Sequence, residues 1–352
     1  MKLVVHIGEI KTGSTSIQTA LAAGTVPKTG LTLHYPCDSL NHNSLEPLFR
    51  AGATADALRI KKIRRSMKKH STADISVISA ERFSTIPPES IERTLSNCFG
   101  DLVSEISIIH YIRPHFGRAV SAYAEQVKIG STDLSLPEFL DAAIQEKRYH
   151  SARRIQKWRD VFGPAYNVRI MSRNVLVNQD VVADFFTATL GTIPANWSSP
   201  SQVNASLCAE GTTYVRTLQS HLTGRLRALR HALGYEFEYL YNKAIPTAKR
   251  TKLTIDRTKA SEFYEAHVSD AIEVDRILGG DNFKNELDID YNAALSRQDS
   301  PIDMSNHDTA RKIIADLLEV ASYDDDRTLA MCIRNARFDR MIKEYKLAMS
   351  AC

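Results

Sequence analysis

Short β-branched runs alternate with helical segments over the first half of this chain, and this alternation constrains the fold more than any other feature. Segments of this kind form strands and helices in turn, which predicts an α/β fold: a mainly parallel sheet flanked by helices on both faces. The ligand site of such a sheet lies at the carboxyl ends of its strands. The expected strands are 3–7, 31–35, 74–81, 106–112 and 166–171, and the expected helices are 14–23, 54–69, 87–99, 115–128 and 151–162.

The pattern changes near residue 200, where prolines and serines predict a connection. We therefore expect residues 1–200 to form the core and residues 201–352 to form a mainly helical C-terminal region. Apolar residues recur at helical spacing in 212–232, 259–278 and 307–321. A chain of 352 residues is long enough for one large core with such an extension.

Composition excludes several classes of protein. The 45 basic and 41 acidic residues give a net charge of +4, which is too balanced for a nucleic-acid-binding protein. The five cysteines are far apart and show no metal-binding spacing, so we expect free thiols and no metal site. No run approaches the roughly 20 apolar residues of a membrane span, and the N-terminal run is too short for a secretion signal. We expect a cytoplasmic protein without stable membrane insertion.

A glycine-bearing loop, 8–16, separates the first strand from the first helix. Such a loop directs backbone N–H groups and the positive end of a helix at an anion. Gly8 and Gly13 have the spacing of a nucleotidase P-loop, but Ser14 stands where that motif needs lysine, and the lysine comes earlier, at Lys11. No segment stands out as a magnesium partner. The alternative is a Ser/Thr-rich turn that only caps the helix.

The run Lys11-Thr12-Gly13-Ser14-Thr15-Ser16 resembles the 5′-phosphosulfate loop of sulfotransferases that use 3′-phosphoadenylyl sulfate (PAPS). The commonest version of that loop has Thr in place of Ser14, an exchange that keeps the hydroxyl group. The resemblance implies a P-loop nucleotide-hydrolase-like sulfotransferase fold. It also implies that Lys11 steadies the leaving phosphate, while the amides and hydroxyls of the loop hold the 5′-phosphate through Thr12, Gly13, Ser14, Thr15 and Ser16.

A second motif, 113–123, follows the strand 106–112 and enters a helix. In the same family an Arg at a strand end and a Ser eight residues later bind the ribose 3′-phosphate, so the resemblance assigns this role to Arg113 and Ser121. A guanidinium group suits phosphate recognition. The alternative for Arg113 is an ordinary ion pair at a helix start, and for Arg118 we expect a surface ion pair.

Transfer of a sulfuryl group to a hydroxyl needs a general base. Glu81 is the first candidate because it ends the strand 74–81 at the sheet edge where Lys11 and Arg113 also lie. Its alternative role is in an ion pair or at a helix cap. His42 is the second candidate, since animal cytosolic sulfotransferases use a histidine, and its alternative is an exposed loop residue. Glu9, inside the loop, would repel a phosphosulfate.

Among sulfotransferases, the chain most resembles bacterial enzymes that act on carbohydrates. This resemblance implies in-line transfer to a hydroxyl of a carbohydrate or glycolipid, with PAPS as co-substrate and no metal. The helical region is then expected to cover the acceptor or to form a homodimer contact. Two alternatives stay open: a nucleotide-dependent small-molecule kinase, and a sulfotransferase-like protein that binds without catalysis.

Overall fold

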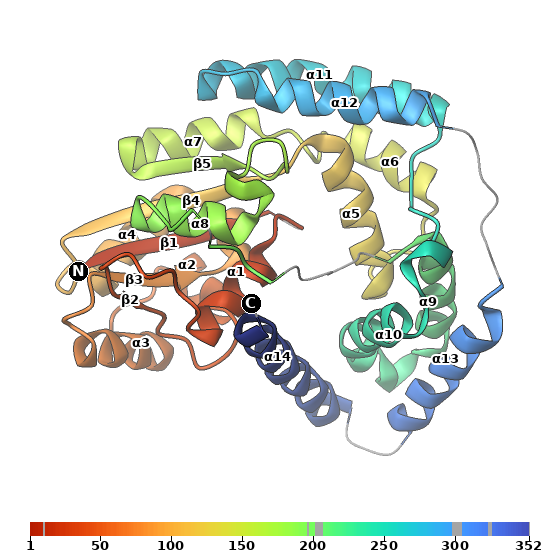
Figure 1. Ribbon diagram of the computed structural model, residues 1–352, viewed down its shortest axis with the longest axis horizontal. Helices are drawn as coiled ribbons and strands as arrows, with labels where there is room; N and C mark the ends of the chain where they lie inside the picture. Colours follow the sequence, from red (N-terminus) through yellow and green to blue (C-terminus); the bar gives the residue numbers. More distant parts are fainter. Residues whose placement is uncertain (10, 196, 201–206, 298–304, 323–325, 352) are drawn as a thin grey trace.

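The described residues of the chain form a parallel sheet covered by helices, with a helical region beyond it (Figure 1). The computed structural model describes residues 1–9, 11–195, 197–200, 207–297, 305–322 and 326–351. Its sheet has five strands in the order β2-β3-β1-β4-β5, and every adjacent pair is parallel. The strands are β1 (Lys2–Gly8), β2 (Leu33–His34), β3 (Ile75–Ser79), β4 (Glu105–Ile112) and β5 (Tyr166–Ile170). The expected α/β fold is confirmed.

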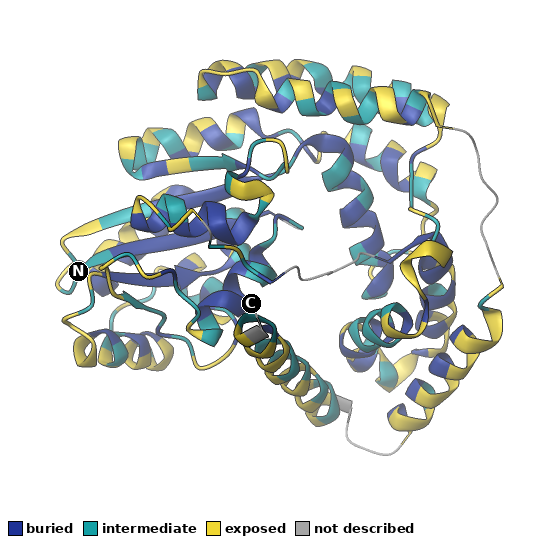
Figure 2. Cartoon of the chain, viewed as in Figure 1, coloured by how far each residue is buried: buried dark blue, intermediate teal, exposed yellow. Residues whose placement is uncertain are grey.

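Alternate residues of the central strand β1 face two different apolar layers. Leu3, Val5 and Ile7 pack with the helices α3 (Leu58–Lys69), α4 (Pro88–Phe99) and α7 (Ala152–Phe162). Val4 packs on the opposite face with α1 (Ser14–Ala23) and α8 (Val181–Leu190). The central strands β1 and β3 and the second half of β4 are buried from both sides (Figure 2), as a parallel sheet with helices on both faces requires.

Helix and strand positions agree closely with the sequence pattern. The predicted helix 14–23 is α1, which ends at Gly24 in the left-handed conformation with φ of 71°. The predicted helix 115–128 is α5 (His115–Lys128). The edge strand β2 covers only two residues of the predicted 31–35. The first half also contains the helices α2 (Glu46–Arg50) and α6 (Leu136–Gln145).

The described part of the C-terminal region is mainly helical, with irregular connections such as 250–256. Its helices are α9 (Ala209–His221), α10 (Arg230–Ala244), α11 (Arg257–Leu278), α12 (Asn282–Leu295), α13 (His307–Ala321) and α14 (Asp326–Ala351). The segment 212–232, where apolar residues recur at helical spacing, is not one helix. Helix α9 ends at His221, and Gly224, with φ of 56°, starts the short 3-10 helix Gly224–Leu229 that leads into α10. The expected boundary near residue 200 falls beside 201–206, outside the described residues.

Helix α14 returns from the far end of this region to the sheet. It packs against α10 and α1, and the C-terminus lies beside α1 in Figure 1. The Tyr345 side chain of α14 is buried in the same apolar layer as Ile17 of α1. The last helix of the chain therefore reaches the element that follows the glycine-bearing loop. Among the described helices, none is long and apolar enough to span a lipid bilayer.

Candidate functional site

The loop between β1 and α1 is tightly folded around two residues in the left-handed conformation. Lys11 has φ of 63° and Gly13 has φ of 76°. Gly8 must lack a side chain, since a Cβ there would stand 2.6 Å from the Thr12 hydroxyl oxygen, and a Cβ at Gly13 would stand 2.7 Å from Val181 of α8. The Thr12 hydroxyl donates to the Glu9 carbonyl at 2.8 Å. Ile10 lies outside the described residues.

The start of α1 is open to an anion. Its N-cap residue is Gly13, and among the described residues no side chain makes a capping hydrogen bond there. The first N–H groups of a helix have no partner within the helix, and they lie at its positive end. Ser14 is buried, while Thr15 and Ser16 are partly exposed. The alternative of a turn that caps its own helix through Ser or Thr is therefore not what the structure has.

Lys11 points toward helix α5. Its Nζ lies 2.9 Å from Oε2 of Glu125, which also pairs with Lys128 at 2.7 Å and accepts a hydrogen bond from the Tyr235 hydroxyl. Burial alone would raise the pKa of Glu125, but the positive charges of Lys128 and Lys11 outweigh it and lower that pKa. Glu125 therefore carries a negative charge beside the loop. Sequence reasoning missed this role, although the i,i+3 spacing of Glu125 and Lys128 was a usable signal.

Arg113 joins the two predicted motifs. It follows β4 directly, and its Nη1 donates to the Ser121 hydroxyl at 2.9 Å and to the Lys11 carbonyl at 3.0 Å. Gly117 makes room for the guanidinium, because a Cβ at this position would lie 2.9 Å from Nε of Arg113. Burial lowers the pKa of Arg113, and the charge of Asp290 in α12 partly opposes this shift.

Glu81 lies in the same part of the molecule. It follows the end of β3 and begins the 3-10 helix Glu81–Thr85. Burial raises the pKa of its carboxyl group, and the negative charge of Glu125 raises it further, whereas the charges of Lys11 and Arg337 and a hydrogen bond with Ser14 act against this. A carboxylate with a raised pKa beside a lysine is suited to accept a proton.

His42 is not the exposed loop residue that was the alternative to a catalytic role. It is only 3% exposed. Its Nδ1 accepts a hydrogen bond from the Ser79 N–H at 3.1 Å, so Nε2 carries the proton and donates it to the Pro36 carbonyl at 3.0 Å. Burial lowers its pKa to about 4. With both ring nitrogens in use, His42 holds its loop against β3.

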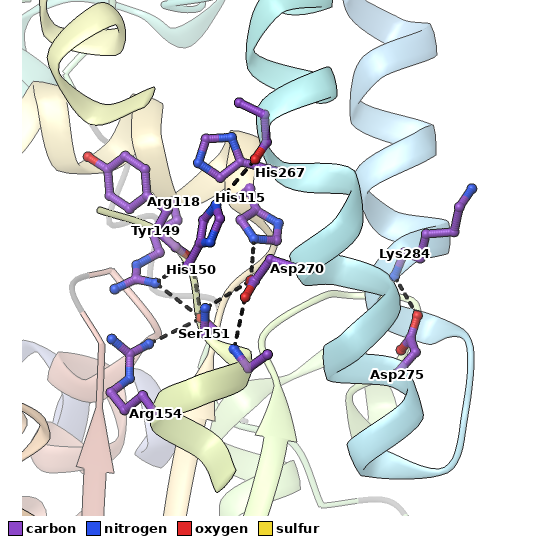
Figure 3. A network of polar contacts seen from close by, with 12 residues as sticks. His115, Arg118, Tyr149, His150, Ser151, Arg154, His267, Asp270, Asp275 and Lys284 are labelled. Carbon is purple, nitrogen blue, oxygen red and sulfur yellow. Dashed lines mark hydrogen bonds and ion pairs between the residues drawn. The ribbon is translucent and has the colours of Figure 1, made fainter. Parts of the chain in front are cut away.

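Glu9 is neutralised within a buried network shown in part in Figure 3. Its carboxylate pairs with Arg118 at 3.0 Å and with Arg154. The expected ion pair of Arg118 exists, but its position at the surface was wrong, since the side chain is 11% exposed. Both arginines also donate to the Ser151 hydroxyl, at 3.3 Å and 3.1 Å. The two guanidinium groups remove the repulsion that Glu9 would exert on an anion in the loop.

A cavity beside the edge strand β5 lies away from these residues. It is lined by Arg159, Tyr166, Arg169 and Asp184 among others, and by none of the predicted site residues. Arg169 is already paired with Asp184, which also accepts a hydrogen bond from the Tyr111 hydroxyl at 2.6 Å. The candidate site is therefore the loop and not this cavity. Within the described ranges, no group of three or more His, Cys, Asp and Glu residues is arranged to hold a metal ion.

Comparisons with known proteins add little to this description of the site. No family model matches the chain, and no curated protein matches it. Among solved structures, the chain is similar to the crystal structure of a sulfotransferase from Alicyclobacillus acidocaldarius, with 14% sequence identity, a TM-score of 0.42, and coverage of 79% of this chain and 96% of that one. At this level of similarity, the function has to be inferred from the residues of the chain itself.

Proposed function

We propose that this protein is a sulfotransferase that moves a sulfuryl group from PAPS to a hydroxyl of a carbohydrate or glycolipid. One observation carries the proposal. The Arg113 guanidinium bonds both the Ser121 hydroxyl and the backbone of Lys11, a residue 102 positions away. This contact joins the two motifs that resemble the same family, although they are far apart in the sequence.

The donor has two anionic ends, and the site has a cationic group for each of them. The open N-terminus of α1 and the Lys11 ammonium suit the 5′-phosphosulfate. The fork of N–H donors on Arg113, with the Ser121 hydroxyl beside it, suits the ribose 3′-phosphate. An arginine for a 3′-phosphate is what separates a PAPS site from an ATP site.

The proposed reaction is a direct displacement. The acceptor oxygen attacks sulfur, the bond from sulfur to the 5′-phosphate oxygen breaks, and adenosine 3′,5′-bisphosphate leaves. The acceptor proton passes to Glu81, whose raised pKa suits a base. The Lys11 ammonium stabilises the charge that develops on the leaving phosphate. The helical region 201–352 is proposed to cover the acceptor.

Calorimetry tests the donor assignment. The protein is titrated with adenosine 3′,5′-bisphosphate and, separately, with ATP and Mg²⁺. We expect the bisphosphate to bind more tightly, and Arg113→Ala to weaken its binding at least tenfold. Lys11→Ala should keep the fold, because Glu125 retains Lys128 and Tyr235 as partners. A preference for ATP and Mg²⁺ would point to a kinase instead.

A transfer assay with ³⁵S-labelled PAPS tests the activity itself. Lys11→Ala should lose most of the transfer to a carbohydrate acceptor while keeping much of its bisphosphate affinity, since this lysine acts on charge that forms during the reaction. If Lys11→Ala and Arg113→Ala both show normal kinetics, the assigned site is wrong. If the wild-type protein binds the bisphosphate but transfers no sulfate to a broad panel of sugars, a binding protein is the better description.

A further inference from the structure

Helix α14 brings an arginine to the edge of the candidate site. The Cζ of Arg337 lies 3.5 Å from the centre of the Tyr235 ring of α10. The Tyr235 hydroxyl donates to Glu125, and Glu125 holds Lys11 at 2.9 Å. A continuous chain of contacts thus runs from Lys11 of the phosphate loop to Arg337 of the last helix, and each residue in it lies more than one hundred positions after the one before.

The guanidinium group of Arg337 has hydrogen-bonding capacity to spare. Stacking on Tyr235 and the nearby Phe338 fixes its plane. Within the described parts of the chain, its N–H groups make no hydrogen bond or ion pair. Arg340, one turn later, differs in this respect, since it pairs with Glu236 at 2.7 Å while stacking on Tyr239. Arg337 is therefore a half-buried cation stacked on a ring, and its N–H groups have no hydrogen-bond acceptor among the described residues.

The contacts of Arg337 indicate which ligand this is, because Tyr235 and Glu125 link it to Lys11 of the phosphate loop. The positive charges of Arg337 and Lys11 both act on the Glu81 carboxyl group. An acceptor whose hydroxyl meets Glu81 is thus within electrostatic reach of Arg337. The anionic ends of the donor already have partners of their own, in Lys11, the start of α1 and Arg113. A second anion near Glu81 would belong to the acceptor.

We infer that Arg337 binds a negatively charged group of the acceptor, a carboxylate or an ester sulfate on a sugar, next to the hydroxyl that is sulfated. This inference rests on the proposed function and deepens it, because it gives the acceptor a charge. Fixed guanidinium groups recognise carboxylate and sulfate oxygens through paired N–H donors, and a stacked arginine loses little further freedom when it binds.

Binding of three matched sugars tests this inference. The probes are p-nitrophenyl β-D-glucoside, the corresponding β-D-glucuronide, and the β-D-glucoside 6-sulfate, each titrated calorimetrically into protein saturated with adenosine 3′,5′-bisphosphate. We expect at least one anionic sugar to bind tenfold or more tightly than the neutral glucoside. The comparison of glucuronide with 6-sulfate tells which anion is preferred.

Variants of the same helix provide the control. Arg337→Gln should remove the preference for the anionic sugar and leave the affinity for the neutral glucoside and for the bisphosphate unchanged, and Arg337→Lys should restore part of it. Arg340→Gln, which changes a paired arginine of α14, should keep the preference. Circular dichroism checks that each variant is folded.

Failure of the inference is distinguishable from failure of the proposed function. If wild-type protein does not bind the bisphosphate, the sulfotransferase assignment fails first. If it binds the bisphosphate but shows no preference for an anionic sugar, or if the preference survives in Arg337→Gln, the role of Arg337 is refuted alone. A tenfold loss of bisphosphate affinity in Arg337→Gln would also refute it, since Arg337 would then be a donor ligand.

Discussion

Arg113 lies so close to Gly117 that a Cβ atom at position 117 would stand 2.9 Å from Nε of the guanidinium group. The two residues belong to the junction between β4 and α5, where the side chain of Arg113 runs along the first turn of the helix toward Ser121. Glycine is less favourable than alanine within a helix, by up to roughly 1 kcal/mol. Its presence there is explained by the space that Arg113 needs.

Replacement of Gly117 by a larger residue should therefore impair binding rather than folding. We expect Gly117→Val to displace the guanidinium and to weaken binding of adenosine 3′,5′-bisphosphate about tenfold, measured by calorimetry. The midpoint of thermal unfolding should change little. Gly280→Ala is the control, because the nearest atom to a Cβ there is 3.9 Å away, and it should leave the affinity unchanged. Normal affinity for the bisphosphate in Gly117→Val would show that Arg113 does not bind this ligand.

Ser121 should contribute less than Arg113 to the same affinity. Removal of its hydroxyl deletes one neutral hydrogen-bonding group, so we expect Ser121→Ala to weaken bisphosphate binding about fivefold, or roughly 1 kcal/mol. Arg113→Lys keeps the charge but loses the fork of donors, and a larger loss is expected. Because Arg113 and Ser121 are in contact, the effects in the double variant should not add. Strict additivity of the two losses would argue against a shared phosphate.

Glu81 should affect the rate and its pH dependence. A base acts in its deprotonated form, so kcat/KM of the wild-type protein should rise with pH as Glu81 ionises. Because burial raises the pKa of Glu81, this rise should come at a higher pH than an ordinary glutamate would give. Glu81→Gln should lower kcat by about 10²–10⁴-fold and remove that limb of the profile, with bisphosphate affinity nearly unchanged. A variant that keeps both the rate and the limb would exclude Glu81 as the base.

The sheet and the phosphate loop were predictable because their signals are local. β-Branched runs such as 106–112 form buried strands, and the glycine-bearing loop that follows the first strand lies at a strand end. In a parallel sheet all strand ends of one kind share an edge. For this reason Lys11, Glu81 and Arg113 were expected near one another, and the contacts of Arg113 with Lys11 and of Glu81 with Ser14 are in line with this.

The partners from the helical region were not predictable, because helical spacing identifies a buried face without telling what that face packs against. Tyr235 and Arg337 meet across two helices that are far apart in sequence. The contact of Tyr235 with Glu125 depends on the path of the chain after residue 207. The break between α9 and α10 was missed for a similar reason: the apolar spacing continues through this segment, whereas the backbone leaves the helical conformation at Leu222 and Thr223 and is left-handed at Gly224.

Asp270 should be important for stability because it joins three helices. It is 7% exposed and accepts hydrogen bonds from the N–H groups of Ser151 and Ala152, at 2.8 Å and 3.1 Å, and from Nε2 of His115 at 2.9 Å (Figure 3). It thereby caps α7, whose own N-cap residue makes no side-chain capping bond. Asp270→Asn keeps the size but loses the charge, and we expect the free energy of unfolding in urea to fall by about 3 kcal/mol.

The loss in Asp270→Asn should depend on pH in a defined direction. Burial alone would raise the pKa of Asp270, but the bonds from His115 and from the Ser151 N–H outweigh it and lower that pKa. A carboxylate of this kind stabilises the fold above its pKa in the unfolded chain, and the contribution is lost as pH falls through the folded value. The difference between wild type and Asp270→Asn should therefore shrink from pH 7 toward pH 3. Asp141→Asn, at an exposed pair with Lys259, should change stability by less than about 0.5 kcal/mol. A difference that grows as the pH is lowered would contradict the role of the Asp270 charge.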